Sequence, residues 1–318
     1  MSAKTKTDSS ESQEELIANP IYDHVFKYLM EDNKVARKLI STIINEEVIE
    51  LSFAPQEYVQ KLDDKVLDKS WSVYRLDFIA RIHTNEGLKI VMIEVQKISL
   101  NTDIMRFRRY LGSQYRNYEN SYIDSEKTTH AMPIYCIFFL GDGLDVKGIP
   151  VITVNPYAAD MTTGKELKDL RNEFIETLHH RSWIVQVPEL KGRRRNEMEI
   201  LLSIFDQANR MNDHHILNLK EEHFPEEYRP VIRRLQQAAV SKEIREAMLV
   251  EDDILEHFRI AERKNQVKLE EKDKIISEKD TVIAEKDTVI AEKEAVIARE
   301  RAEKEALIAK LAALENTK

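Results

Sequence analysis

Two acidic residues, Asp77 and Glu94, stand inside short apolar runs of the kind that form buried strands. Asp77 lies within the run YRLDFIARI, and Glu94 follows the run IVMI. Burying a carboxylate costs free energy unless a charge or a hydrogen-bond donor meets it. The two residues are therefore either a structural compromise or the chemically active part of the molecule.

The turn between these runs determines whether the two acids are neighbours. Residues 73–83 and 88–96 are expected to form a hairpin around the segment TNEG. If Asn85 and Glu86 are the two turn residues, the acids lie directly opposite each other and project from the same face. If Gly87 also belongs to the turn, a slip of one residue puts them on opposite faces. The sequence leaves both registers open.

Neighbours of Glu94 extend the candidate site. Gln96 shares the face of Glu94 because side chains alternate along a strand, whereas Lys97 points away unless the strand ends there. Two facing carboxylates repel each other, and a divalent cation such as Mg²⁺ or Mn²⁺ relieves this repulsion. The backbone carbonyl of Val95 is placed to be a third ligand. Such an ion activates water and stabilises charge on a phosphodiester.

Salt bridges provide the alternative explanation for the acids. In that interpretation Asp77 and Glu94 pair with Arg75, Arg81 or Lys97 at a strand edge.

The surrounding pattern predicts a mixed α/β protein. NPIYDHVFKYLMEDNKVARKLISTIINEE has helical spacing of apolar residues and begins with Asn19-Pro20, a good start signal. VIELSF, MPIYCIFFLG, IPVITVN and SWIVQVPEL are strand candidates, and DIMRFRRYLGSQYRNYENSY is a helix candidate. From about Glu197 the pattern is helical to the end.

Five of these segments, taken in order, resemble one known family. NPIYDHVFKYLM, YRLDFIARI, IVMIEVQ, the helix RFRRYLGSQY and the apolar strand after it are similar to the recombination-promoting nuclease (Rpn) or putative transposase branch of the PD-(D/E)XK nuclease superfamily. The resemblance covers roughly residues 19–210. It implies a restriction-endonuclease-like α/β core, with a mixed central sheet flanked by helices, and a DNA endonuclease that promotes recombination or accompanies mobile elements.

The resemblance also implies roles for individual residues. Asp77 and Glu94 would be metal ligands, and Gln96 would stand where most of the superfamily has a lysine that orients the attacking water. An amide orients water but supplies no positive charge, so Lys97 or an arginine of the next helix would supply it. Asp23 would be a further acid, or a helix-start residue favoured by the helix dipole.

Arginines and histidines outside the hairpin offer further candidates. Arg106, Arg109 and Arg116 are candidate phosphate contacts, with a solvated helix face as the alternative. The doublets His179-His180 and His214-His215 are not expected to bind metal, because no cysteine or nearby acid completes a zinc set.

The C-terminal part repeats every seven residues. Isoleucine recurs at 276, 283, 290 and 297, while the partner core position carries Asp280, Asp287, Glu294 and Arg301. A strong coiled coil needs both positions apolar, so the expectation is a long, charged helix that dimerises weakly, with a solvated single helix as the alternative. The expected organisation is a polar tail (1–18), a nuclease-like domain (19–210), a helical extension (211–261) and the long helix (262–318).

Composition limits the function classes. The net charge of −9 excludes a generally basic protein that coats nucleic acid, so DNA would contact a local basic patch. The single cysteine, Cys136, lies in an apolar run and fits a reducing compartment. Without a signal core or membrane span, the expectation is a soluble cytoplasmic protein. A nuclease-fold protein without activity, which acts through its helical tail, is the rival to the endonuclease.

Overall fold

The computed structural model describes residues 16–53, 78–97, 103–167 and 172–315. Its strands are β1 (Leu16–Ala18), β2 (Val48–Phe53), β3 (Phe78–Thr84), β4 (Gly87–Gln96), β5 (Ser121–Ile123), β6 (Thr129–Ala131), β7 (Ile134–Leu140), β8 (Val151–Val154), β9 (His180–Gln186) and β10 (Ile216–Asn218). Its α-helices are α1 (Asp23–Met30), α2 (Asn33–Ile44), α3 (Asp103–Arg116), α4 (Glu173–Thr177), α5 (Glu197–Leu202), α6 (Arg229–Val240) and α7 (Lys242–Glu315).

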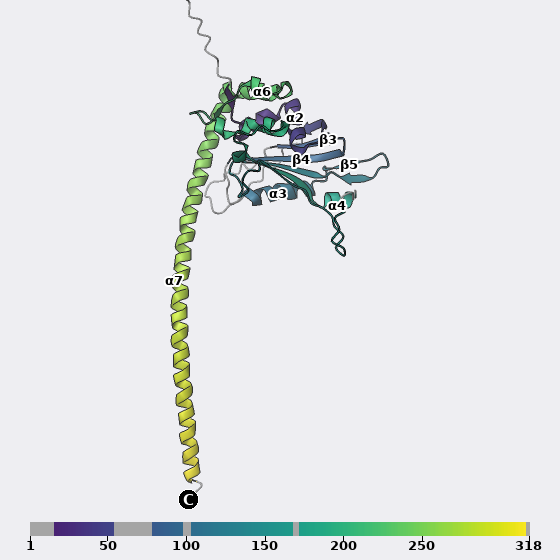
Figure 1. Cartoon of the computed structure of the whole chain (residues 1–318). Coiled ribbons are helices and arrows are strands. Elements are labelled where there is room, and N and C mark those ends of the chain that lie inside the picture. The colour runs from purple at the N-terminus through teal and green to yellow at the C-terminus, as the bar shows by residue number, and fades with distance from the viewer. Residues whose placement is uncertain (1–15, 54–77, 98–102, 168–171, 316–318) are drawn as a thin grey trace, which may run out of the picture. The chain divides into compact units, whose positions relative to one another are not determined.

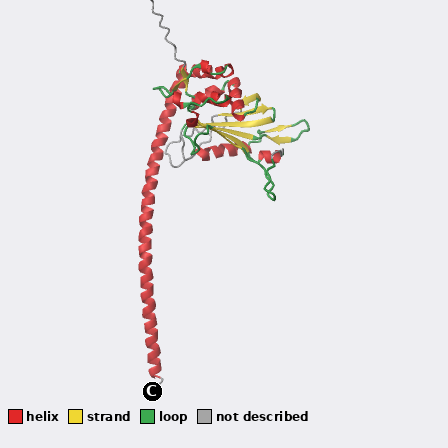
Figure 2. Ribbon diagram, viewed as in Figure 1, coloured by secondary structure: helices red, strands yellow, loops and turns green. Residues whose placement is uncertain are grey.

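A six-stranded mixed sheet forms the centre of the first part of the chain, in the order β2-β3-β4-β7-β9-β8. The strands β2, β3 and β4 pair antiparallel, β4, β7 and β9 pair parallel, and β8 returns antiparallel to β9. The mixed α/β class predicted from the sequence is confirmed. Figure 2 shows this sheet with helices on either side. The pairs β1–β10 and β5–β6 form two further sheets of two strands each.

Two apolar cores lie on the two faces of the sheet. The larger core contains residues of α1, α2, α5 and α6 together with alternate residues of the strands. The smaller core contains Phe107 of α3, with Ile90, Met92 and Cys136 of the strands. Figure 1 shows α2 and α6 on one side of the sheet and α3 on the other. Cys136 is buried, as its apolar setting predicts, and burial raises the pKa of its thiol to about 12.

The β3–β4 hairpin has the two-residue turn Asn85–Glu86, with Thr84 paired to Gly87 and Phe78 paired to Ile93. Gly87 has φ +106°, a conformation that residues with a Cβ rarely adopt, and the Thr84 hydroxyl accepts the Glu86 N–H at 3.1 Å. Of the two registers that the sequence left open, the described residues adopt the one with Asn85 and Glu86 as the turn residues, and not the one-residue slip.

A buried ion pair fixes the turn end of this hairpin. Lys89 is 4% exposed, and its ammonium lies 2.8 Å from Oε2 of Glu46. Tyr135 donates its hydroxyl to the other Glu46 oxygen at 3.0 Å. The chain therefore compensates a buried cation with a carboxylate that is itself hydrogen-bonded, as a low-dielectric interior requires.

The C-terminal part of the first unit differs from the expected helical extension. β10 pairs with β1, joining Leu16 to Asn218 and Ala18 to Ile216, and residues of α6 belong to the larger core. Ile244 and Met248 of α7 belong to the same core. The chain divides into two compact units, Met1–Glu251 and Asp252–Lys318.

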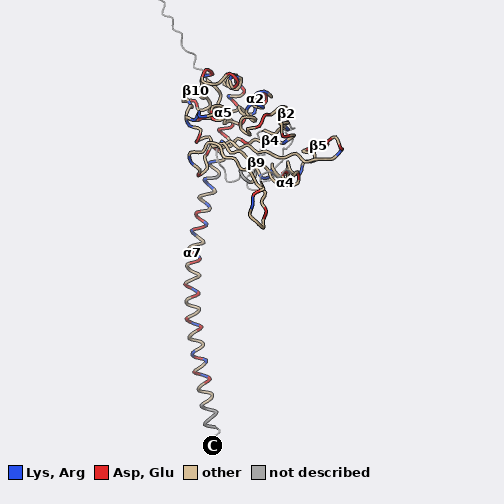
Figure 3. Tube along the Cα trace, turned by 45° about the vertical axis from the view of Figure 1, so that its right-hand side comes forward, with Lys and Arg blue, Asp and Glu red and all other residues tan. Residues whose placement is uncertain are grey.

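The helix α7 is one continuous helix of 74 residues. It begins at Lys242, earlier than the expected 262, because α6 ends at Val240 and the Ser241 hydroxyl accepts the Ile244 N–H at 3.3 Å. Figure 3 shows basic and acidic residues interspersed along it. Among the described residues, no helix has both the length and the apolar character needed to cross a membrane.

Candidate functional site

Glu94 lies near the end of β4, between β3 and β7 in the middle of the sheet. Its side chain is 4% exposed. Side chains alternate along β4, and Ile90 and Met92 belong to the smaller core, so Glu94 and Gln96 continue the face that α3 covers. A carboxylate in such a position carries a desolvation cost that only specific partners or a cation offset.

An aromatic pair connects this face to α3. Glu94 is paired with Phe138 of β7 in the parallel ladder, and the Phe138 and Phe107 rings lie 4.3 Å apart. The helix that carries the candidate arginines therefore packs over the strand next to Glu94. Arg109 and Arg116 are exposed on it, which suits phosphate contact or solvation equally, and the side chain of Arg106 lies outside the described residues.

Asp77 and Arg75 also lie outside the described residues. The pairing of Phe78 with Ile93, the last described pair of the hairpin, is the one that a turn of Asn85 and Glu86 requires. Of the salt-bridge partners considered as an alternative, Arg81 bonds elsewhere, because its Nη2 donates to the Glu119 carbonyl at 2.8 Å.

Lys97 and Asp23 belong to a different group of side chains. The strand ends at Gln96, and the Lys97 ammonium lies 3.5 Å from the ring centroid of Tyr22, which directly precedes Asp23. Lys97 thus projects toward the start of α1, on the face opposite to Glu94 and Gln96. The structure places the described candidates in two groups, on the two sides of the end of β4.

Three residues that the sequence did not single out, Glu251, His24 and Lys27, complete the group at α1. Oε2 of Glu251 accepts the Asp23 N–H at 3.0 Å and lies 4.0 Å from Nδ1 of His24. Burial raises the pKa of Glu251, with the charge of Asp23 adding to the effect, while the His24 hydrogen bond and the charge of Lys97 oppose it. Oδ2 of Asp23 bonds Lys27 at 2.6 Å. No local pattern signals Glu251, because its role comes from contact with a helix more than two hundred residues earlier.

The end of β4 is held by an unusually close approach of backbone. Gly141, just after β7, donates its N–H to the Gln96 carbonyl at 2.7 Å. A Cβ on Gly141 would lie 2.2 Å from the Lys97 carbonyl oxygen, so only glycine fits there. Because successive carbonyls of a strand point to opposite sides, the Val95 carbonyl is directed toward the β3 side.

The histidine doublet at 214–215 differs from the sequence-based expectation. Asp213 supplies the acid that was thought to be lacking, and ligand atoms of Asp213, His214 and His215 lie within 4.8 Å of one another. The signal in the sequence was the acid immediately before the doublet.

Comparison of the chain with protein-family models, curated proteins and solved structures gave no match.

Proposed function

We propose that the first unit is a metal-dependent phosphodiesterase with a PD-(D/E)XK restriction-endonuclease-like core. Within that class, the proposed activity is endonucleolytic cleavage of DNA, of the kind that promotes recombination or accompanies mobile elements. The observation that carries the proposal is Glu94, a carboxylate 4% exposed at the end of a central strand, with Gln96 two residues further on the same face.

The residues fit a hard divalent cation. Mg²⁺ and Mn²⁺ prefer oxygen ligands, and the proposal assigns them the Glu94 carboxylate, the Val95 carbonyl and Asp77. The bound ion would supply a water of lowered pKa and a counter-charge for the phosphate. Gln96 would orient that water through its amide, and Arg109 and Arg116 on α3 would hold phosphates of the DNA backbone.

The arrangement of Lys97 changes one part of the expected mechanism. Its ammonium lies over the Tyr22 ring, on the α1 side of the sheet. The proposal therefore gives the positive charge near the phosphate to the arginines of α3, and it gives Lys97 and Asp23 the role of positioning the end of β4.

The deciding experiment is digestion of supercoiled plasmid by the purified full-length chain with Mg²⁺, with Mn²⁺ or with chelator. Nicked or linear product is expected only with metal. Glu94→Ala and Asp77→Ala should abolish it, because each removes a ligand. Glu126→Ala, which changes an exposed glutamate of the β5–β6 turn, is the matched control and should cleave like wild type. Wild-type cleavage by the Glu94→Ala, Asp77→Ala double variant would refute the proposal.

A second candidate function rests on α7. Valine and isoleucine pairs recur along it, such as Val282-Ile283 and Val289-Ile290, and these side chains are about half exposed. An inactive nuclease-fold protein that binds a partner through this helix would account for them. Absence of metal-dependent cleavage, with partner binding lost on removal of α7, would favour that function.

A further inference from the structure

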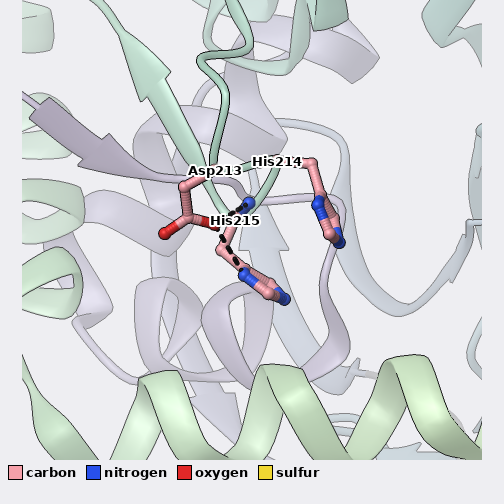
Figure 4. A group of neighbouring side chains, drawn as sticks. All are labelled: Asp213, His214 and His215. Carbon is pink, nitrogen blue, oxygen red and sulfur yellow. Dashed lines mark hydrogen bonds and ion pairs between the residues drawn. The ribbon is translucent and has the colours of Figure 1, made fainter.

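Asp213, His214 and His215 form the turn that leads into β10. Figure 4 shows the Asp213 carboxylate against the backbone and ring of His215, with the His214 ring nearby. One ligand atom of each residue lies within 4.8 Å of the other two. Consecutive side chains of an extended segment project in opposite directions, but here the two imidazole centroids are only 4.3 Å apart. The turn therefore brings three metal-ligating groups together.

The backbone of this turn is held from the other end of the chain. Asn19 donates its backbone N–H to the His215 carbonyl at 2.8 Å and its side-chain amide to the His214 carbonyl at 3.0 Å. Asn19 is buried, and it exchanges two amide hydrogen bonds with Gln207, at 2.9 and 3.0 Å. The peptide groups that carry the two histidines are thus fixed before any ligand binds, which lowers the entropy cost of binding.

The contact between Asp213 and His215 has the dimensions of a chelate. Oδ1 of Asp213 lies 2.8 Å from Nδ1 of His215. Two ligand atoms on one tetrahedral zinc, each about 2.0–2.1 Å from it, are roughly 3.3 Å apart. A cation that replaces the shared proton therefore requires these two atoms to move apart by only about half an ångström.

A second contact orients the carboxylate. The His215 backbone N–H donates to Oδ1 of Asp213 at 3.0 Å. The His215 ring is largely buried and lies 5.1 Å from the Tyr22 ring, which restricts its rotation. His214 and Asp213 are exposed, so the site is open to solvent.

We propose that this turn binds one borderline divalent metal ion, with Zn²⁺ preferred, through the Asp213 carboxylate and the imidazoles of His214 and His215. Two imidazoles and one carboxylate are a donor set that zinc takes in proteins, with a water in the fourth position. Mg²⁺ prefers all-oxygen sites, so this ion differs from the one proposed at Glu94. The inference is independent of the proposed nuclease function.

Metal binding by the full-length chain tests the proposal. Protein stripped with chelator is titrated calorimetrically with Zn²⁺ in excess Mg²⁺, which occupies oxygen-ligand sites, and bound zinc is counted after dialysis. We expect one equivalent for wild type. His214→Ala removes an exposed ligand without disturbing the core. Removing a side chain that only hydrogen-bonds to a metal ligand typically lowers metal affinity about 10- to 100-fold, so loss of a ligand itself should lower the zinc affinity at least as much. Asp213→Asn, which keeps the shape but removes the charge, should do likewise.

His223→Ala is the matched control, because His223 is an exposed imidazole beside a single carboxylate, 3.8 Å from Glu222. It should bind zinc like wild type. Substitution with Co²⁺ gives a second readout, since its visible absorption reports nitrogen and oxygen ligation and should disappear in His214→Ala. Equal zinc affinity in wild type and His214→Ala, or an equivalent lost equally in His223→Ala, would overturn the proposal.

Discussion

Gln96 is the residue at which the proposed chemistry departs most from a lysine-based site. Its amide orients water but carries no charge, so its removal should cost less than removal of a metal ligand. We expect Gln96→Ala to lower the cleavage rate on the order of 10- to 1000-fold, and Glu94→Ala to lower it further. Single-turnover rates at saturating metal measure the difference. An unchanged rate for Gln96→Ala would assign Gln96 a structural role only.

The contacts of His130 at the β5–β6 hairpin should depend on pH. Its Nε2 lies 2.9 Å from Asp124 and its Nδ1 lies 2.6 Å from Glu173, so both ring nitrogens face carboxylates. The hydrogen bond to Asp124 and then that to Glu173 raise the pKa of His130 above 6.5, while the His130 hydrogen bond lowers the pKa of Asp124 below 3.8. The histidine links the hairpin to α4, and protonation of its ring strengthens both contacts.

The sign of the pH effect follows from these directions. The raised pKa of His130 gives stabilisation that is complete below 6.5 and lost as pH rises through the folded value; the lowered pKa of Asp124 gives stabilisation that is complete above 3.8 and lost as pH falls. The contact should be strongest between these limits. NMR titration of the imidazole should show a pKa above 6.5 that falls in Asp124→Asn. An identical titration curve in the variant would contradict the assignment.

The packing where β4 and β7 end depends on Gly141. A Cβ there would meet the Lys97 carbonyl oxygen at 2.2 Å, so Gly141→Ala forces the end of β4 to move. Overpacking of this kind costs about 1–3 kcal/mol. For a unit of this size, each kcal/mol lowers the melting temperature by about 2–4 °C. We also expect cleavage activity to fall, because Gln96 precedes the displaced carbonyl.

Gly143→Ala is the control for that substitution. It lies two residues further along the same loop, and its nearest atoms, in Gln186 and Pro188, are 3.8 Å from an added Cβ. Its melting temperature should stay close to wild type. If Gly141→Ala and Gly143→Ala have the same melting temperature, the close approach at Gly141 does not contribute to stability.

Local chemistry explains which elements could be predicted from the sequence. The β3–β4 hairpin follows from its turn residues, although its register was left open until the structure showed Thr84 paired to Gly87. The helix α2 follows from its apolar spacing and from Asp32, whose side chain accepts the N–H of Lys34 and Val35. The side of the sheet on which Lys97 lies depends on where β4 stops. At that point the backbone of Gln96 and Lys97 lies against Gly141, which is distant in the sequence.

Long-range pairing explains most of the remainder. The strands β1 and β10 are three residues each and carry no strong pattern of their own, yet their pairing brings the turn at Asp213 to Asn19. Short strands of this kind form because the neighbouring core holds them, and such packing has no local sequence signal. For the same reason, no local sequence pattern indicates the contact between Asp23 and Glu251.

The residue pattern of α7 favours self-association of the whole chain. At ~1.5 Å per residue its 74 residues extend roughly 110 Å. Isoleucines 276, 283, 290 and 297 are each about half exposed and share one stripe. The partner core position carries Asp280, Asp287 and Glu294, so a parallel pair would bring like charges together. Dimerisation should be weak and should strengthen with salt, which screens this repulsion.

Light scattering of the full-length chain at low and high salt, and of a chain ending at Ala261, tests this expectation. The full-length mass should approach that of a dimer as salt and concentration rise, and the shortened chain should remain a monomer. Ile283→Ser with Ile290→Ser should abolish the dimer, whereas Ala284→Ser with Ala291→Ser, one residue further along the same helix, should retain more of it. A dimer would also supply two sites, one for each strand of a duplex. Identical monomer masses for both chains under all conditions would leave α7 as a solvated single helix.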